Sequence, residues 1–192
     1  WNNGDPQEWS SIRAFRMADS LDDYRCPAYP IVKSEQTPVH ETYLSDDILF
    51  ADFGQAAFGQ LNITVSSNRK DTLTVSIGEC LKNGRLDPEP GGSRRFLRQK
   101  TALLPGRYTY IIKIPADKRN TGRSAVKMPG SIGEVYPFRY CEVEGRSIKD
   151  KSVTVSRQTV HYPFDDSASV FSCPDTALQQ IWEMCRYSMK AT

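Results

Sequence analysis

The chain has 192 residues, 39% of them hydrophobic and 25% charged, which is ordinary for a soluble globular protein and argues against a disordered chain. The formal net charge of +2 gives no overall basic field, so the composition offers no support for nucleic acid or a membrane surface as a partner. No apolar run approaches the about 18 residues that span a bilayer, and the first residues, WNNGDPQEW, lack the charged start and apolar core of a signal peptide.

Residues 1–42 are predicted to form an extended strap or the end of a preceding module. Prolines recur too often in this segment for a long helix, at Pro6, Pro27, Pro30 and Pro38. The competing interpretation is a helix of less than two turns, because helical spacing is seen at Trp9, Ile12, Phe15 and Arg16. Trp9 is either an aromatic platform for a sugar ring or, more often for a lone tryptophan, an anchor that fixes the strap to a core.

Residues 48–60, ILFADFGQAAFGQ, organise the prediction for the rest of the chain. An apolar run leads into two glycines, Gly54 and Gly59, and the following LNITV alternates apolar and polar residues like a half-buried strand. This pattern predicts one strand, a tight corner at which the chain reverses, and a second strand, with glycines where a Cβ would obstruct the backbone. A structural role is therefore predicted for Asp52, Phe53, Gly54, Gln55 and Gly59.

Two neighbouring segments then alternate with a period of two residues. Leu61, Ile63 and Val65 form the apolar face of the first, and after the polar turn SNRKD the same pattern continues in residues 72–77. This period in adjacent segments indicates antiparallel strands with one face directed into the protein.

The region up to Cys173 continues as predicted strands and loops. Residues 80–107 contain the turn signals KNG, DPEPGG and LPG and are predicted to be a long surface connection, as are residues 115–133. Strands are predicted at residues 108–114, 134–145, 151–163 and 168–172. Pro137 favours the start of a strand or a sheet edge. The resulting seven or eight strands predict a mainly β fold, an antiparallel, jelly-roll-like β-sandwich over residues 43–173.

Residues 174–192 have a different period. Pro174 and Asp175 supply a helix start, because proline fits the first turn and a carboxylate is favourable at the positive end of the helix dipole. Apolar side chains then recur at spacings of three and four residues, which predicts an amphipathic helix whose apolar stripe is a domain interface. The stripe consists of Leu178, Ile181, Trp182, Cys185 and Met189. The abrupt start of the chain and its end inside this helix suggest a mature, processed or excised piece.

Residues that bind metals or catalyse reactions form no recognisable arrangement. The five cysteines are widely separated without a CxxC pair, and the chain has only two histidines, so no metal site and no cofactor are predicted. The odd number of cysteines predicts that most of them are small buried side chains and leaves one disulfide possible. Among the acidic residues, Glu142 and Glu144 included, no spacing identifies a glycosidase pair.

Four segments follow one another along the chain: ADFGQAAFGQLNITV, IGECLKNGRL, PFRYCEVEG and SVFSCPDTALQQIWEMCRYSMKAT. In this order they resemble bacterial α-L-rhamnosidases of glycoside hydrolase family 78, over about residues 49–192. The resemblance implies β-sandwich modules in front of an (α/α)6-barrel that hydrolyses terminal α-L-rhamnose with inversion. It also implies that the helix starting near Pro174 is the connector that leads into the barrel.

The sequence departs from the family pattern at two places. It has Cys173-Pro174-Asp175 and Gln179-Gln180 where the family commonly shows Ser-Asp and Leu-Asn, which are small changes at a helix start and on a helix face. The acid-rich barrel motif that carries the general acid of the family would lie after Thr192. The resemblance therefore assigns no catalytic residue to this chain.

Two hypotheses of different classes follow. In the first, the chain is the non-catalytic β-sandwich part of an α-L-rhamnosidase-like enzyme, inactive alone, and its partner is the catalytic barrel of the same chain. In the second, it is a stand-alone carbohydrate-binding module, which requires exposed Trp or Tyr residues on one face. The expected ligand is a rhamnose-containing oligosaccharide or glycoside, and the expected location is periplasmic or secreted.

Overall fold

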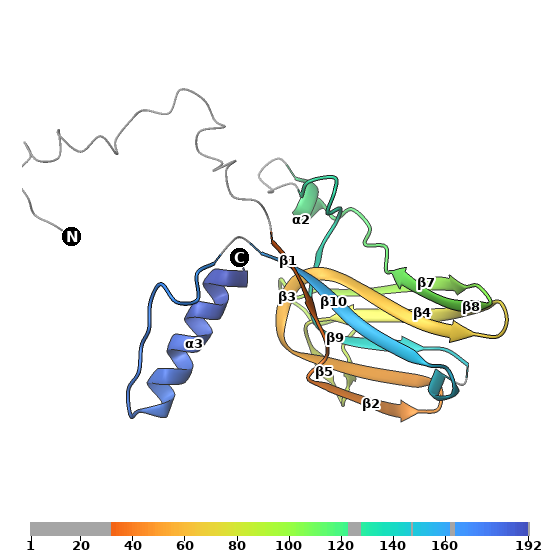
Figure 1. The fold of residues 1–192 in the computed structure, drawn as a ribbon, viewed down its shortest axis with the longest axis horizontal. Coiled ribbons are helices and arrows are strands. Elements are labelled where there is room, and N and C mark those ends of the chain that lie inside the picture. The colour runs from red at the N-terminus through yellow and green to blue at the C-terminus, as the bar shows by residue number, and fades with distance from the viewer. Residues whose placement is uncertain (1–31, 123–127, 147, 162–163, 192) are drawn as a thin grey trace, which may run out of the picture. The chain divides into compact units, whose positions relative to one another are not determined.

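A computed structural model describes residues 32–122, 128–146, 148–161 and 164–191 (Figure 1). The described strands are β1 (Val32–Gln36), β2 (His40–Ser45), β3 (Ile48–Ser67), β4 (Asp71–Gly78), β5 (Leu81–Lys82), β6 (Arg85–Leu86), β7 (Phe96–Leu103), β8 (Gly106–Ile111), β9 (Tyr136–Glu144) and β10 (Val153–His161). The described helices are α2 (Lys118–Thr121), the short 3₁₀ helix η2 (Ile148–Asp150) and α3 (Thr176–Ala191). Most of the predicted strap, including the Trp9 pattern, and Cys26 lie outside the described residues. Residues 32–42 are extended as predicted, but they contribute to strands β1 and β2 of the sandwich.

The strands form a mainly β, antiparallel β-sandwich, which confirms the predicted fold class. Eight strands are hydrogen-bonded into one sheet, because β3 belongs to both layers. Six of them follow one another in the order β1-β10-β3-β9-β4-β7, and β2 and β8 each pair with β3 beside this path. Residues 48–52 of β3 lie between β2 and β9, and this layer continues through β4 to β7. Residues 62–65 of β3 lie between β10 and β8, and β1 pairs with the far side of β10. Figure 1 shows β3 curving from one layer into the other.

The change of layer occurs at the DFGQ segment. The pairing of β3 with β9 shifts register between Asp52 and Ala57, so residues 53–56 lie opposite the single residue Arg139. Gly54 in this bulge has a φ of 81°, a left-handed conformation that favours glycine. The predicted need for a glycine is confirmed. The predicted chain reversal is wrong, because the bulge bends one 20-residue strand without reversing it.

Gly59 meets a different requirement, the close approach of a neighbouring strand. A Cβ at this position would lie 2.4 Å from the carbonyl oxygen of Gln158 on β10. We expect Gly59→Ala to lower the free energy of unfolding in a urea titration by about 1–3 kcal/mol, as overpacking does. Gly130→Ala is the matched control, since no atom of the described residues, apart from its chain neighbours, lies within 4 Å of a Cβ at that position. Equal stability of the two variants would contradict this explanation.

The hydrophobic core lies between the two layers and is supplied by alternate residues of the strands. Leu61, Ile63 and Val65 of β3 and the corresponding residues of β4 each expose 1% or less of their surface. The two period-two segments therefore form strands as predicted. They do not pair with each other, because β3 pairs with β10 and β8 at this point while β4 pairs with β7 and β9. The polar turn between them connects the two layers.

Two predictions of local structure are wrong. Residues 80–107, predicted to be a surface connection, contain the edge strand β7 and the small β5–β6 hairpin. Apolar and polar residues do not alternate clearly along β7, because Leu103 is the only one of its residues that is buried. Residues 168–172, predicted to be a strand, form none and are exposed. The KNG turn is confirmed, since Asn83 and Gly84 have φ values of 53° and 74° and close the hairpin as Asn-Gly turns commonly do.

Helix α3 confirms the predicted C-terminal helix. The Asp175 carboxylate accepts hydrogen bonds from the backbone N–H groups of Ala177 (2.8 Å) and Leu178 (3.3 Å), so Asp175 caps the start of the helix. Within the described ranges, no helix is long and apolar enough to cross a membrane.

Candidate functional site

The candidate site is built around Arg157, which lies in the middle of β10 and points into the sandwich. It exposes 1% of its surface. Its guanidinium carbon lies 4.8 Å from the centre of the Phe53 ring and 5.3 Å from that of Phe138. These two rings meet edge to face, with centroids 5.7 Å apart. A cation held against two aromatic faces in this way is stabilised by the negative charge density of the rings.

One edge of the guanidinium fixes the bulge in β3. Nη1 of Arg157 donates hydrogen bonds to the carbonyl oxygen of Gln55 (2.9 Å) and to that of Phe138. Gln55 lies within the bulge, where β3 has no paired residue on β9. A side chain from β10 thereby satisfies backbone acceptors on β3 and β9 at the point where β3 changes layer.

The other edge of the guanidinium faces β1. Nε and Nη2 of Arg157 both donate to Oε1 of Gln36, at 3.2 and 2.6 Å. Gln36 is the register partner of Arg157 across the β1–β10 pair. Within the described part of the chain, every hydrogen-bond acceptor of Arg157 is thus a neutral oxygen. Burial lowers the pKa of Arg157 to about 10, because the charged form loses its hydration.

Asp52 at the edge of the bulge is bound by a second arginine. Nε and Nη2 of Arg139 donate to Oδ1 (2.8 Å) and Oδ2 (2.9 Å) of Asp52, a two-pronged arrangement that fixes geometry as well as charge. The backbone N–H of Gly54 donates to Oδ1 at 2.7 Å. Asp52 therefore joins the left-handed glycine to β9.

The Asp52–Arg139 pair predicts a pH dependence of stability. The hydrogen bond from Arg139 holds the pKa of Asp52 below its ordinary value of 3.8. Because the folded-state pKa is depressed, the stabilisation is complete above about pH 4 and is lost as the pH falls through the folded-state value. We expect the free energy of unfolding to fall more steeply below about pH 4 in the wild type than in Asp52→Asn. Urea titrations at several pH values measure this, and parallel curves would refute it.

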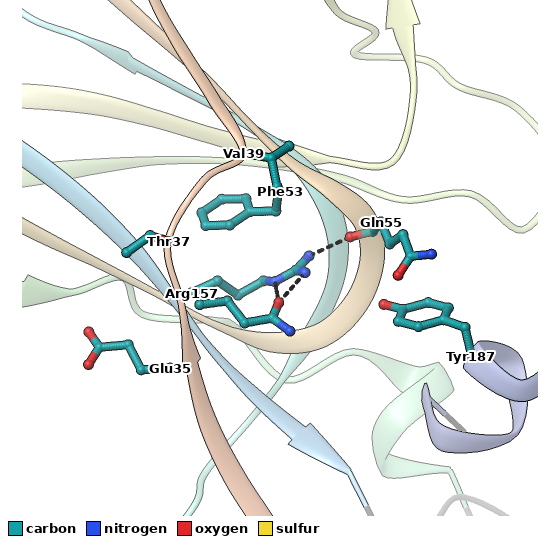
Figure 2. Close-up of a pocket in the computed structure, with 8 residues that line it drawn as sticks. Glu35, Thr37, Val39, Phe53, Gln55, Arg157 and Tyr187 are labelled. Carbon is teal, nitrogen blue, oxygen red and sulfur yellow. Dashed lines mark hydrogen bonds between the residues drawn. The ribbon is translucent and has the colours of Figure 1, made fainter. Parts of the chain in front are cut away.

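A pocket of about 350 Å³ opens beside Arg157 (Figure 2). It is lined by Glu35, Gln36, Thr37, Val39, Phe53, Gln55, Arg157 and Tyr187. Phe53 and Gln55, two of the predicted motif residues, are therefore pocket residues. Tyr187 reaches the pocket from α3, as Figure 2 shows. Its hydroxyl donates a hydrogen bond to the carbonyl oxygen of Ala56, which attaches α3 to the bulge.

The five residues predicted as a domain interface all lie on α3, and no residue of this helix is buried. Leu178, Ile181 and Met189 expose 50%, 52% and 70% of their surface. Trp182, Cys185 and Met189 line a groove of about 330 Å³ between α3 and the segment before it. The stripe is therefore an apolar surface that the described residues cover only in part.

The acidic residues of β9 are held by arginines. Glu142 exposes 3% of its surface and accepts hydrogen bonds from Nε (2.8 Å) and Nη2 (2.7 Å) of Arg85 and from the backbone N–H of Leu86 (2.9 Å). Glu144 accepts from Arg85 and Arg98. Carboxylates bound in this way are unsuited to serve as a proton donor and a base. Among the residues described, no three metal-binding side chains come together.

The cysteines differ from the prediction. Cys80, Cys141, Cys173 and Cys185 are free thiols, and of these only Cys141 is buried. Burial raises the pKa of the Cys141 thiol and leaves it unreactive. The expectation that most cysteines are buried is therefore wrong for the described ones, because two of them lie next to or within the exposed helix α3.

Arg157, Gln36 and Tyr187 were not predicted from the sequence. The sequence contains one signal for Arg157. It follows Val153 and Val155 at a spacing of two residues, so it lies on the inward face of β10 and places a charge at a core position. Gln36 lies in the segment predicted to be a strap. Tyr187 lies outside the apolar stripe of α3, where the sequence pattern gives no reason for a contact.

Residues 42–161 match the family described as the bacterial α-L-rhamnosidase concanavalin-like domain. Among solved structures, the chain is similar to a rhamnosidase from Klebsiella oxytoca with rhamnose bound, at 14% sequence identity and a TM-score of 0.40. That similarity covers 69% of this chain and 30% of the rhamnosidase chain, so this chain spans well under half the length of that protein. A comparison with functionally curated proteins finds no match.

Proposed function

The chain belongs to the bacterial α-L-rhamnosidase concanavalin-like domain family, and from this premise we propose that it is the non-catalytic β-sandwich of an α-L-rhamnosidase-like glycoside hydrolase. Its role is to support a catalytic (α/α)6-barrel of the same polypeptide, which hydrolyses terminal α-L-rhamnose with inversion. The observation that carries the proposal is the exposed apolar stripe of α3.

Helix α3 is attached to the rest of the chain through its second half. Tyr187 bonds to Ala56 in the bulge of β3, and Lys190 Nζ lies 2.6 Å from an Asp166 carboxylate oxygen. Leu178 and Ile181, one turn apart in the first half, are half exposed. Burying such a stripe against a second domain would gain roughly 1.5–3 kcal/mol per fully covered large apolar side chain. This favours a packing surface for a neighbouring domain over a solvent-facing helix.

The chemistry belongs outside the sandwich in this proposal. Glycoside hydrolysis requires one protonated carboxyl group and one ionised carboxylate about 5–9.5 Å apart on either side of the glycosidic bond. Asp52 and Glu142 instead each form a two-pronged ion pair with an arginine. A carboxylate whose two oxygens are both bound by an arginine is suited to structural support and unsuited to proton transfer.

An Ile181→Glu substitution tests the proposed interface. In a polypeptide that carries both the sandwich and the barrel, the new carboxylate would be buried without a partner, which is costly. We expect the midpoint of thermal unfolding of that polypeptide to fall by roughly 5 °C or more, and cleavage of an aryl α-L-rhamnoside to fall with it. The isolated 192-residue chain should be unaffected, because Ile181 is already 52% exposed there.

Gln180→Glu is the matched control, since it introduces the same carboxylate at an exposed polar position of α3. It should leave both polypeptides unchanged. An equal loss of stability in the isolated chain and in the two-domain polypeptide would place the effect of Ile181→Glu inside the sandwich and refute the interface.

A stand-alone carbohydrate-binding module is the second candidate function. It requires several aromatic faces on one surface to stack on sugar rings. The large exposed aromatic residues of the described part are Tyr43, Tyr108 and Phe171, which belong to β2, β8 and the segment before α3. Within the described ranges no ring contact joins any two of these three residues, which favours the supporting role.

A further inference from the structure

The charge of Arg157 is unusual within this protein. Several other arginines hydrogen-bond to a carboxylate, namely Arg85, Arg98, Arg119, Arg139 and Arg186. Arg157 is far more buried than these, yet within the described ranges it has no carboxylate at hydrogen-bonding distance. Asp52 has only an electrostatic interaction with Arg157, without a hydrogen bond, and its carboxylate is hydrogen-bonded to Arg139. Buried charges in proteins are generally paired, so this guanidinium is missing an anion.

The geometry of the guanidinium shows where an anion fits. Its Nε–Nη2 edge is the side on which a carboxylate binds through two parallel hydrogen bonds. That edge is now occupied by the single oxygen of Gln36, at two unequal distances of 3.2 and 2.6 Å. Gln36 is the last residue of the edge strand β1 and is only half buried, so its side chain has room to rotate away. Nη1 stays bound to the bulge, which keeps the guanidinium in place.

We propose that the pocket beside Arg157 binds the carboxylate of a sugar acid, a hexuronate, which displaces Gln36 from the Nε–Nη2 edge. The pocket volume of about 350 Å³ lies near the lower end of the range for small-ligand sites, as suits one sugar ring. Thr37 and Gln55 contribute polar groups that suit sugar hydroxyls. The choice of a sugar rests on the proposed function, whereas the carboxylate is inferred from Arg157 alone.

Among the described residues that line the pocket, Glu35 is the acidic one. Its carboxylate accepts a hydrogen bond from the Ser156 hydroxyl at 2.7 Å. In Figure 2 it points away from the guanidinium. It therefore leaves the proposed carboxylate position open.

Isothermal titration of the 192-residue chain with galacturonate, galactose and acetate tests the proposal. Galacturonate should bind at least about tenfold more tightly than galactose, because only the acid forms charge-assisted hydrogen bonds with Arg157. It should also bind more tightly than acetate, which lacks the ring. Equal binding of galacturonate and galactose, or no binding of galacturonate, would overturn the carboxylate site. Acetate binding as tight as galacturonate binding would overturn the sugar assignment.

Two substitutions of Gln36 keep the test independent of folding defects at Arg157. Gln36→Glu supplies an internal carboxylate to the same edge, so this variant should unfold at a higher temperature and lose galacturonate binding. Gln36→Ala frees the edge and should keep or strengthen binding. Galacturonate binding by Gln36→Glu at the wild-type level would refute displacement of Gln36. None of these results alters the Ile181→Glu comparison. The proposed ligand site and the proposed domain interface are therefore tested independently.

Discussion

Arg157→Met is expected to lower the free energy of unfolding by about 2–4 kcal/mol. Methionine has a similar length but donates no hydrogen bond, so the carbonyl oxygens of Gln55 and Phe138 lose the donors that Nη1 supplies. A buried acceptor left without a partner, such as the Phe138 carbonyl, costs about 1–3 kcal/mol, and the partly buried Gln55 carbonyl costs less. Removing a buried charge offsets part of this loss, and for that reason the expected total is below the sum for the two carbonyls. Equilibrium unfolding in urea measures the change.

Arg98→Met is the control for this prediction. The Arg98 side chain is 52% exposed and forms a salt bridge with Glu144 at 2.6 Å. Exposed pairs of this kind contribute about 1 kcal/mol or less, so the control should be nearly neutral. Arg157→Lys should fall between the two, because lysine keeps the charge without the planar fork of donors. If Arg157→Met is as stable as Arg98→Met, Arg157 does not hold the bulge together.

The fold class follows from the sequence because burial of one strand face imposes a period of two residues. Leu61, Ile63 and Val65 carry that period and are buried as expected. The period reports which face is buried and carries no information on the partner strand. For this reason the pattern does not show that residues 61–65 of β3 lie in a different layer from β4, the next strand in the sequence. An edge strand such as β7, with one buried residue, escapes the same method.

Only those features of the candidate site that depend on residues close together in the sequence could be predicted. The left-handed backbone at Gly54 is a property of that single position, and the glycine signals it. The space at Gly59 is set by Gln158 on β10, and the sequence shows only that the residue is small. Arg157 reaches Gln55 over 102 residues of sequence and Gln36 over 121 residues. Contacts of this range depend on the register of three strands, which no local pattern specifies. The sequence therefore identifies the bend and misses the side chain that stabilises it.

A second large effect is expected at the Arg85–Glu142 pair, which attaches the β5–β6 hairpin to β9. The Glu142 side chain is 4% exposed, whereas that of Arg85 is 43% exposed. Removing Arg85 therefore leaves a buried group without its partner, whereas removing the Glu142 charge leaves an exposed one. Glu142→Gln leaves an arginine that water can reach and an amide oxygen that still accepts from the Leu86 N–H. Arg85→Ala leaves a buried carboxylate with the Leu86 N–H as its remaining donor within the described ranges.

We expect Arg85→Ala to cost about 3 kcal/mol of unfolding free energy, and Glu142→Gln about 1 kcal/mol, because an unpaired buried charge is more costly than an unpaired exposed one. The double variant Arg85→Ala/Glu142→Gln should then be more stable than Arg85→Ala alone, since the neutral amide no longer needs a cation. A double-mutant cycle from urea titrations of the four proteins measures this coupling. Simple addition of the two single costs would mean that Glu142 remains solvated without Arg85, and that the hairpin is held to β9 by other contacts.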